Sequence, residues 1–273
     1  MSAAASAAAP IRTVLIGATG RMGANILRLM PRFPALRLTG ALASEASEGI
    51  GQDACGRLGA AACGVSISAA LPPLLSTADL ALDFSSAEAA AANLAACVTA
   101  GVPLLLGTTG LPRELQGPLA LAARSIALLV APNTSLGATL LLELVQRAAR
   151  ALPPAYDIEV LESHHRDKID APSGTALALG NAAAHGRGVS LEQMGLYARH
   201  GRTAARAPGQ IGFAVLRGGD VVGEHEVLFL GEGERLSLRH CATDRAVFAQ
   251  GALVAGQWLA RQPPGRYEMK DIL

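Results

Sequence analysis

The chain has 273 residues, of which 51% are hydrophobic and 16% charged, and its formal net charge is +1. This apolar content excludes a globally disordered chain, and the length predicts one or two domains. The near-neutral charge shows no basic stripe, so we expect no nucleic-acid partner and no membrane-surface partner.

The N-terminal segment 1–10 consists almost entirely of Ala and Ser. It lacks the basic and Leu-rich regions of a signal peptide, so we expect a disordered leader. The stretch 126–142 comes closest to a membrane span, but a Pro-Asn-Thr-Ser sequence at 132–135 interrupts it. We therefore expect no transmembrane segment.

The chain has four cysteines, and none forms a C-x-x-C pair: Cys55, Cys63, Cys97 and Cys241. We expect them to be scattered through a sizeable core. This pattern favours reduced thiols in a cytoplasmic protein over a disulfide framework or a zinc site.

In the first half of the chain, short apolar runs alternate with Ala-rich helical stretches. Strands are predicted at 13–16, 36–42, 80–84, 102–106 and 126–130, with helices at 22–30, 87–100 and 113–125. Strands that are apolar throughout and separated by helices indicate βαβ units with right-handed crossovers. The fold class is therefore α/β, with a doubly wound parallel sheet.

The pattern changes in the second half. A Leu-rich helix at 138–152 ends at two prolines, and a strand at 157–162 and a helix at 175–185 follow. Strands at 211–216, 224–230 and 235–241 are separated by glycines, and we expect them to be neighbours in a mixed or antiparallel sheet. A final helix is predicted at 246–261.

A glycine-rich loop follows the first predicted strand and opens the first helix. Its glycines have the spacing G-x-x-G-x-x-G, at Gly17, Gly20 and Gly23. A tight strand–helix turn without a ligand would also use glycine. At the first βα junction of a parallel sheet, however, this spacing favours dinucleotide binding, with the phosphates at the helix N-terminus. The predicted cofactor-binding residues are Gly17, Ala18, Thr19, Gly20, Arg21 and Met22.

The second predicted strand lacks the acidic residue that usually binds the ribose 2′-hydroxyl of NAD. It ends in Ala43-Ser44, and Glu45 comes two positions later. A 2′-phosphate would meet no carboxylate at Ala43, and Arg21 would attract it. The cofactor is therefore NADH or NADPH, and the sequence slightly favours NADPH or the use of both cofactors.

Two further loops follow predicted strands and carry small polar side chains. In open α/β sheets, ligands bind beyond the carboxyl ends of the strands. Ordinary turn and capping chemistry is the alternative interpretation. The shared edge with the glycine loop favours cofactor contacts, for which the candidates are Gly107, Thr108, Thr109, Ala131, Pro132, Asn133 and Thr134.

The segment 164–175 is the most informative part of the sequence. Two adjacent histidines, His164 and His165, and then Lys168 precede a helix start at Ser173-Gly174-Thr175. Free N–H groups at a helix start and nearby cations suit a carboxylate, and a histidine can act in proton transfer. A solvated loop with a Ser N-cap is the alternative. No metal site is expected, because adjacent histidines in a strand point to opposite faces.

The residues from Glu162 to Ala176 resemble the signature of the 4-hydroxy-tetrahydrodipicolinate reductase (dihydrodipicolinate reductase) family. The resemblance covers about 12–273 and includes the glycine loop, Asp83-Phe84-Ser85, and the run from Arg217 to Glu226. It implies a Rossmann-like dinucleotide-binding domain, 1–134 with 245–273. A second, α+β domain at 135–244, built on an open mixed sheet, would bind substrate and form a homotetramer. Hinges are expected near 133–135 and 243–245.

The resemblance also implies the reaction: NAD(P)H-dependent reduction of 4-hydroxy-tetrahydrodipicolinate, via dihydrodipicolinate, to tetrahydrodipicolinate in lysine and diaminopimelate biosynthesis. By similarity, His164 is a proton donor or acceptor and Lys168 a proton donor. The residues implied to bind the small dicarboxylate are His165, Gly174 and Thr175, with Ser173 and Arg245 as further candidates.

Two other functions fit parts of the pattern. A two-domain dehydrogenase acting on aspartate or homoserine would share the nucleotide domain, but the paired histidines and the Pro-Ser-Gly-Thr sequence argue against it. A redox-sensing regulator would bind a dinucleotide without turnover, and would need a partner surface for which the charge gives no sign.

Overall fold

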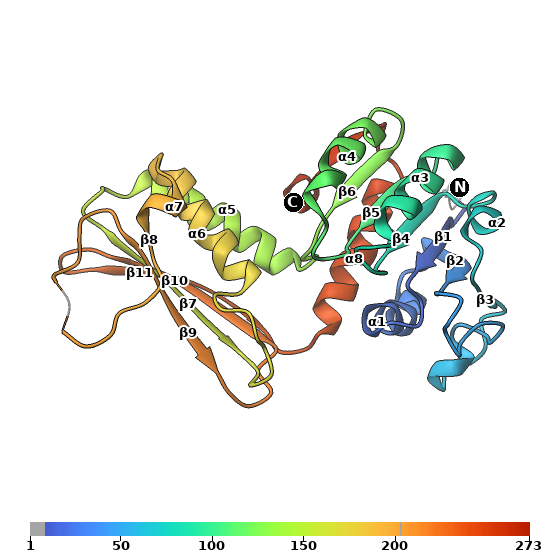
Figure 1. Ribbon diagram of the computed structural model, residues 1–273, viewed down its shortest axis with the longest axis horizontal. Coiled ribbons are helices and arrows are strands. Elements are labelled where there is room, and N and C mark those ends of the chain that lie inside the picture. The colour runs from blue at the N-terminus through green and yellow to red at the C-terminus, as the bar shows by residue number, and fades with distance from the viewer. Residues whose placement is uncertain (1–8, 203) are drawn as a thin grey trace, which may run out of the picture. The chain divides into compact units, whose positions relative to one another are not determined.

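The computed structural model describes residues 9–202 and 204–273, so most of the predicted leader lies outside the described residues. The described chain forms two compact units. Unit 1 contains the described residues up to Ser135 together with Ala246–Leu273, and unit 2 contains Leu136–Arg245. Figure 1 labels the elements of both units.

Unit 1 is built on a seven-stranded sheet in which every strand pairing is parallel. The strand order is β12-β6-β5-β4-β1-β2-β3, which contains the 3-2-1-4-5-6 order of a Rossmann fold. The strands are β1 (Ile11–Ile16), β2 (Leu36–Leu42), β3 (Ile67–Ser68), β4 (Leu80–Asp83), β5 (Leu104–Leu106), β6 (Ala127–Val130) and β12 (Gly265–Tyr267).

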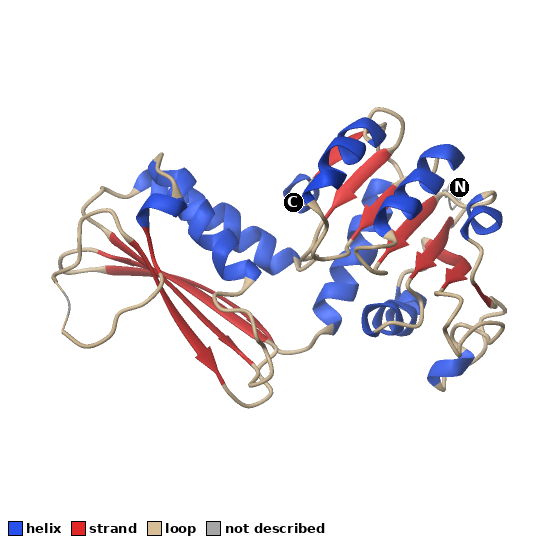
Figure 2. Cartoon of the chain, in the orientation of Figure 1, coloured by secondary structure: helices blue, strands red, loops and turns tan. Residues whose placement is uncertain are grey.

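Strands β4 and β5 of unit 1 are buried along their whole length, because helices cover both faces of the sheet. Apolar residues of β1, β4, β5 and β6 pack with residues of α3 and α4 to form its core. Figure 2 shows the helices on the two sides. They are α1 (Arg21–Leu29), α2 (Leu71–Leu75), α3 (Ala90–Ala100), α4 (Gln116–Ala122) and α8 (Ala246–Leu259).

Unit 2 is a five-stranded mixed sheet with helices on one face. Its order is β11-β10-β7-β9-β8, in which β10 pairs antiparallel with β7 and β11, while β9 pairs parallel with β7 and β8. The strands are β7 (Asp157–His164), β8 (Gly195–Leu196), β9 (Ile211–Arg217), β10 (Gly223–Leu230) and β11 (Arg235–Ala242).

Two long helices of unit 2, α5 (Leu136–Ala151) and α6 (Gly174–Arg187), pack against each other over this sheet. A short helix, α7 (Leu191–Met194), follows them. Alternate residues of β7 are buried, so one face of the strand contacts the helices. This alternation decides which polar side chains of the strand end inside unit 2.

The fold class predicted from the sequence is confirmed, but several details of the prediction are wrong. The last three predicted strands are not consecutive neighbours, because β7 lies between β9 and β10. Arg113 to Leu115 form a 3-10 turn, and the predicted helix there is shortened to α4. The strands β3, β8 and β12 have two or three residues each and show no periodicity in the sequence.

The expectation that the four cysteines are scattered through the core is wrong for three of them. Cys97 is buried, whereas Cys63 and Cys241 are exposed and Cys55 is half-buried. In the part of the chain that the structure describes, no helix is both long and apolar enough to cross a membrane.

Candidate active site

Strand β7 carries two ionisable side chains into the interior of unit 2. Its buried positions are Ile158, Val160, Glu162 and His164, so the two polar residues continue the apolar face of the strand. A buried carboxylate needs hydrogen-bond donors and a compensating charge. The elements around the end of β7 supply both.

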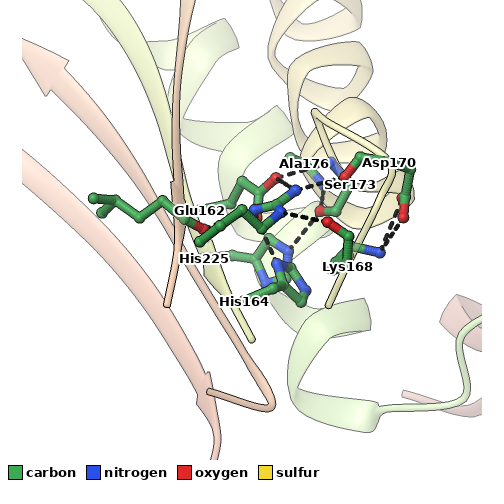
Figure 3. Close-up of polar contacts among 9 residues, drawn as sticks. Glu162, His164, Lys168, Asp170, Ser173, Ala176 and His225 are labelled. Atoms are coloured by element: carbon green, nitrogen blue, oxygen red, sulfur yellow. Dashed lines mark hydrogen bonds and ion pairs between the residues drawn. The ribbon is translucent and has the colours of Figure 1, made fainter. Parts of the chain in front are cut away.

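Glu162 is the centre of a hydrogen-bonded cluster (Figure 3). Its side chain is fully buried, and Arg217 of β9 donates to both carboxylate oxygens, at 2.9 Å each. The backbone N–H of Ser173 donates to Oε1 at 3.0 Å, and Nδ1 of His164 lies 2.5 Å from Oε2. Glu162 therefore links β7, β9 and the start of α6 at one point.

These contacts set the ionisation state of the cluster. Burial alone would raise the pKa of Glu162, but hydrogen bonds from Arg217 and His164 outweigh it and hold the pKa below its ordinary value. Burial lowers the pKa of His164, and the attraction of Glu162 offsets this only in part. At neutral pH the cluster thus contains an ionised carboxylate and a neutral imidazole.

The neutral ring of His164 has one available tautomer. The ionised Glu162 carboxylate can only accept hydrogen bonds, so Nδ1 carries the proton and Nε2 has the lone pair. A β-carbon built on Gly223 would lie 3.0 Å from this Nε2, so the glycine leaves room beside it. In this state His164 can accept a proton but cannot donate one from Nε2.

A second buried histidine, His225 of β10, completes the cluster. Its ring lies edge-on to that of His164, with centroids 5.1 Å apart, and its Nε2 hydrogen-bonds with the hydroxyl of Ser173 at 3.1 Å. Burial, reinforced by the nearby His164, lowers the pKa of His225 to about 4.

The lowered pKa of His225 predicts a pH-dependent stability. Between its unfolded value near 6.5 and about 4, the unfolded chain binds a proton that the native state does not, so stability falls as the pH falls. The free energy of unfolding in urea should decrease by about 2 kcal/mol from pH 7 to pH 5 on account of this group. The His225→Gln variant should lose this part of the dependence of unfolding free energy on pH, whereas His200→Gln, at an exposed position, should keep it. An equal dependence on pH in the native protein and both variants would contradict the prediction.

Lys168, predicted as a proton donor, and three of the predicted substrate-binding residues lie in the turn between β7 and α6 and at the start of α6. Nζ of Lys168 is held by both carboxylate oxygens of Asp170, at 2.8 and 2.9 Å. His165 is half-buried, and Gly174 and Thr175 are the first residues of α6. The structure thus brings Lys168 and the helix start close to the Glu162 cluster, because Arg217 also donates to the carbonyl oxygens of Lys168 and Asp170.

Of the two remaining candidates, Ser173 belongs to this cluster and Arg245 does not. The hydroxyl of Ser173 is buried, accepts the N–H of Ala176 as the N-cap of α6, and bonds with His225. Arg245 is exposed in the segment between β11 and α8, outside this hydrogen-bonded cluster.

In unit 1, the glycine-rich loop joins β1 to α1. Gly17 has a φ of +83°, and a β-carbon there would lie 2.5 Å from the carbonyl oxygen of Phe84. A β-carbon on Gly23 would lie 2.3 Å from the carbonyl oxygen of Gly17. Packing within the chain therefore explains both glycines.

Packing explains Gly20 less well. It is exposed, and its β-carbon would meet only the Gly17 carbonyl oxygen, at 3.3 Å. It is the N-cap of α1, which has no side-chain cap, so the first N–H groups of the helix face a position without side-chain bulk. This arrangement fits a pyrophosphate.

Residues at the end of β4 pack against the glycine-rich loop. Asp83 is fully buried and accepts the N–H and hydroxyl of Ser85 at 2.9 and 2.6 Å and the amide of Asn93 at 2.9 Å. Burial raises the pKa of its carboxyl group in spite of these bonds. The contacts fix the turn that contains Phe84, whose carbonyl group lies against Gly17.

The two other predicted cofactor loops follow β5 and β6 at the same edge of the sheet. Gly107 and Thr108 are buried, while Thr109 is exposed. After β6 and the buried Ala131, the Asn133 side chain accepts the N–H of Ser135 at 2.9 Å, and the hydroxyl of Thr134 donates to the carbonyl oxygen of Phe248 at 2.6 Å. Thr134 therefore ties its loop to α8, and Pro132 is exposed.

A cation absent from the sequence-based candidates lies next to the glycine loop. A β-carbon on Gly49 would lie 2.8 Å from Cγ2 of Thr19 and 3.4 Å from Nε of Arg57. The guanidinium of Arg57 thus flanks the same backbone position as Thr19, in the segment that follows β2. No motif marks Arg57, because its position depends on how the long β2–β3 connection folds back.

Sequence reasoning assigned no role to Glu162, Arg217 or His225. One signal was available: Glu162 and His164 occupy alternate positions of a strand whose other alternate positions are apolar. That pattern places both on the buried face, but it does not identify their partners on other strands.

Comparison with known families agrees with this arrangement. Residues 11–134 match the model of the N-terminal domain of dihydrodipicolinate reductase, and residues 137–273 match that of its C-terminal domain. The chain belongs to the dihydrodipicolinate reductase family.

Relatives named 4-hydroxy-tetrahydrodipicolinate reductase match this family member over nearly their full length. The protein of Anaeromyxobacter dehalogenans (strain 2CP-1) is 45% identical over 96% of this chain and 97% of its own. That of Halorhodospira halophila is 44% identical over 95% and 97%. Among solved structures, the dipicolinate-bound dihydrodipicolinate reductase from Paenisporosarcina sp. TG-14 matches with a TM-score of 0.78 at 23% identity, covering 97% of this chain and 100% of that one.

Proposed function

We propose that the protein is an NAD(P)H-dependent 4-hydroxy-tetrahydrodipicolinate reductase that forms tetrahydrodipicolinate, via dihydrodipicolinate, in lysine and diaminopimelate biosynthesis. The observation that carries this proposal is that hydrogen bonds of the Glu162–Arg217 cluster hold the Lys168 turn and the α6 start, in a chain of this family. Within the chain, 1–134 and 245–273 form the dinucleotide-binding domain, and 135–244 form the substrate-binding and oligomerisation domain.

The dinucleotide is held by unit 1 and supplies the hydride when bound. Gly20 and the α1 N-terminus bind the pyrophosphate, and the remaining residues of 17–22, with 107–109 and 131–134, line the cofactor. Arg21 and Arg57 lie at or beside the loop and would attract a 2′-phosphate, since no carboxylate stands at Ala43.

Unit 2 binds the dicarboxylate substrate and carries the residues that transfer the proton. Gly174 and Thr175 at the α6 N-terminus bind one carboxylate, and His165 and Arg245 bind the dicarboxylate through their side chains. Lys168 donates a proton to the substrate. His164 is the proton donor or acceptor, and in its neutral ring with the lone pair on Nε2 it must take up a proton there before it can donate one. Ser173 supports the site by fixing the helix start.

The test of this function is oxidation of NADH or NADPH, followed by nicotinamide absorbance with freshly generated dihydrodipicolinate. Turnover that requires this substrate supports the proposal. Dinucleotide binding without turnover supports the regulator, and turnover with aspartate or homoserine supports the other dehydrogenase class.

Replacing His164 by Gln should lower kcat about tenfold, which corresponds to losing about 1.4 kcal/mol of transition-state stabilisation. The Kd for NADPH should stay unchanged, because the predicted cofactor-binding residues are in unit 1. Steady-state kinetics over a pH series and cofactor titration by fluorescence measure the two effects. An unchanged kcat and pH profile would remove His164 from proton transfer.

Coenzyme selectivity gives a separate test of Arg57. The Arg57→Ala variant should lower kcat/KM for NADPH about tenfold, since a hydrogen bond to a charged group contributes about 1.5 kcal/mol or more. Its kcat/KM for NADH should stay the same. Arg28→Ala, an exposed arginine in the last turn of α1, is the matched control and should change neither. Loss confined to Arg21→Ala would assign the 2′-phosphate to Arg21 instead.

We also propose that the protein is a cytoplasmic homotetramer assembled through the unit 2 sheet, with no nucleic-acid or membrane partner. The face of the sheet opposite Phe213 and His164 carries Leu161, Leu216 and Leu228, and Leu216 is 61% exposed. Light scattering coupled to gel filtration measures the assembly, and a monomeric mass would contradict it.

A further inference from the structure

The connection between β2 and β3 brings two cysteines together. One ligand atom each of Asp53, Cys55 and Cys63 lies within 4.8 Å of the others, so the two sulfur atoms are neighbours. Cys63 is exposed and Cys55 is half-buried. Neither takes part in the proposed reaction.

A single carboxylate holds both cysteine-bearing segments in place. Oδ1 of Asp53 accepts the N–H groups of Cys55, Gly56 and Cys63 at 3.0, 2.7 and 3.1 Å. Oδ2 accepts the N–H of Gly64 at 2.7 Å. The hydrogen bonds lower the pKa of Asp53 to about 2, so the anchoring carboxylate stays ionised at neutral pH.

These contacts decide between a metal site and a dithiol. Both oxygens of Asp53 already accept backbone N–H groups, and the Cys63 thiol also points at Oδ1, 3.6 Å away. A carboxylate engaged in this way is an anchor of the turn and a poor metal ligand. The two thiols remain as the reactive groups, and a disulfide requires them to approach to about 2 Å.

We propose that Cys55 and Cys63 form a reversible intramolecular disulfide by exchange with low-molecular-weight disulfides such as oxidised glutathione. The exposed Cys63, as thiolate, attacks one sulfur of the small disulfide and releases one small thiol, which leaves a mixed disulfide. The Cys55 thiol then gives up its proton and attacks the Cys63 sulfur, which releases the second small thiol. Two protein thiols are oxidised, and one small disulfide is reduced to two thiols.

The surroundings set the order of the two steps. Burial, with the adjacent Cys63 thiol and Asp53 carboxylate, raises the pKa of Cys55 to about 12. Cys55 is therefore the resolving thiol, and Cys63, which is also the more accessible, reacts first.

The test uses the full-length protein incubated with oxidised glutathione and digested with trypsin without reduction. Cleavage after Arg57 separates Cys55 from Cys63. The peptide that carries Cys63 also carries Cys97. Fragmentation mass spectrometry should therefore find the two peptides joined through Cys63, and reduction should release them. Separate peptides, with glutathione on Cys63 or with both thiols free, would overturn the proposal.

Two variants make the result specific. Cys55→Ser should leave Cys63 as a stable glutathione adduct, because the resolving thiol is gone. Cys97→Ser removes the other thiol of the peptide that carries Cys63 and should leave the joined peptides unchanged. Joined peptides that disappear in Cys97→Ser would assign the cross-link to that cysteine and would also overturn the proposal.

Discussion

Replacing Lys168 by Met is expected to lower kcat by about 10²–10⁴-fold, the contribution typical of a positioned general acid. Methionine keeps most of the length of the side chain but can neither donate a proton nor attract a carboxylate. KM for the dicarboxylate should rise as well, whereas the Kd for NADPH should not change. The Asp170 carboxylate that holds Nζ is largely exposed, so its loss of a partner should cost little stability.

The matched control for Lys168 is Arg166→Met. Arg166 lies in the same turn and is also cationic, but it is exposed, and its backbone N–H donates to Gly219. Steady-state kinetics with both variants separate a specific role of Lys168 from a general effect of positive charge. Normal kinetics in Lys168→Met, or an equal defect in Arg166→Met, would contradict the assignment of the proton donor.

The α/β fold of unit 1 was predictable from the sequence because its signals are local. Each central strand is an apolar run followed by a helix, and the right-handed crossover rule limits the arrangements that such a series can adopt. The glycine loop was found for the same reason. Its residues are adjacent in sequence, and its position at the first βα junction gives the motif its meaning.

The sheet of unit 2 was predicted less completely because its pairing is not local. Sequence order suggested that β9, β10 and β11 lie side by side, yet β7 separates β9 from β10. The Glu162–Arg217 pair depends on this arrangement, since the two residues are 55 positions apart and meet only when β7 and β9 pair. Arg57 and the Cys55–Cys63 pair depend likewise on a long connection without periodic signals.

A large loss of folding stability is expected for the Arg217→Met variant. Replacing Arg217 by Met leaves the Glu162 carboxylate buried with only His164 and one backbone N–H as donors. Breaking a buried ion pair by removing one partner typically costs about 3–5 kcal/mol, and urea unfolding should detect a loss of that size. Arg239→Met removes a similar pair with Glu224 at the surface of the same sheet, where the loss should be small.

The pH dependence distinguishes an unpaired charge from a packing defect. Without Arg217, burial is no longer outweighed, so the pKa of Glu162 should rise above its unfolded value. The folded variant then binds more protons than the unfolded chain. The difference in unfolding free energy between the native protein and the variant should therefore shrink as the pH falls from neutral toward 5. In the double variant Glu162→Gln with Arg217→Met the buried carboxylate is gone, so the deficit in unfolding free energy should be smaller at neutral pH. It should not shrink as the pH falls, because the pKa of His164 loses the attraction of Glu162 that partly offsets its burial. If the loss of unfolding free energy in Arg217→Met stays constant with pH, Arg217 stabilises the fold through packing, and the charge of Glu162 contributes nothing to the loss.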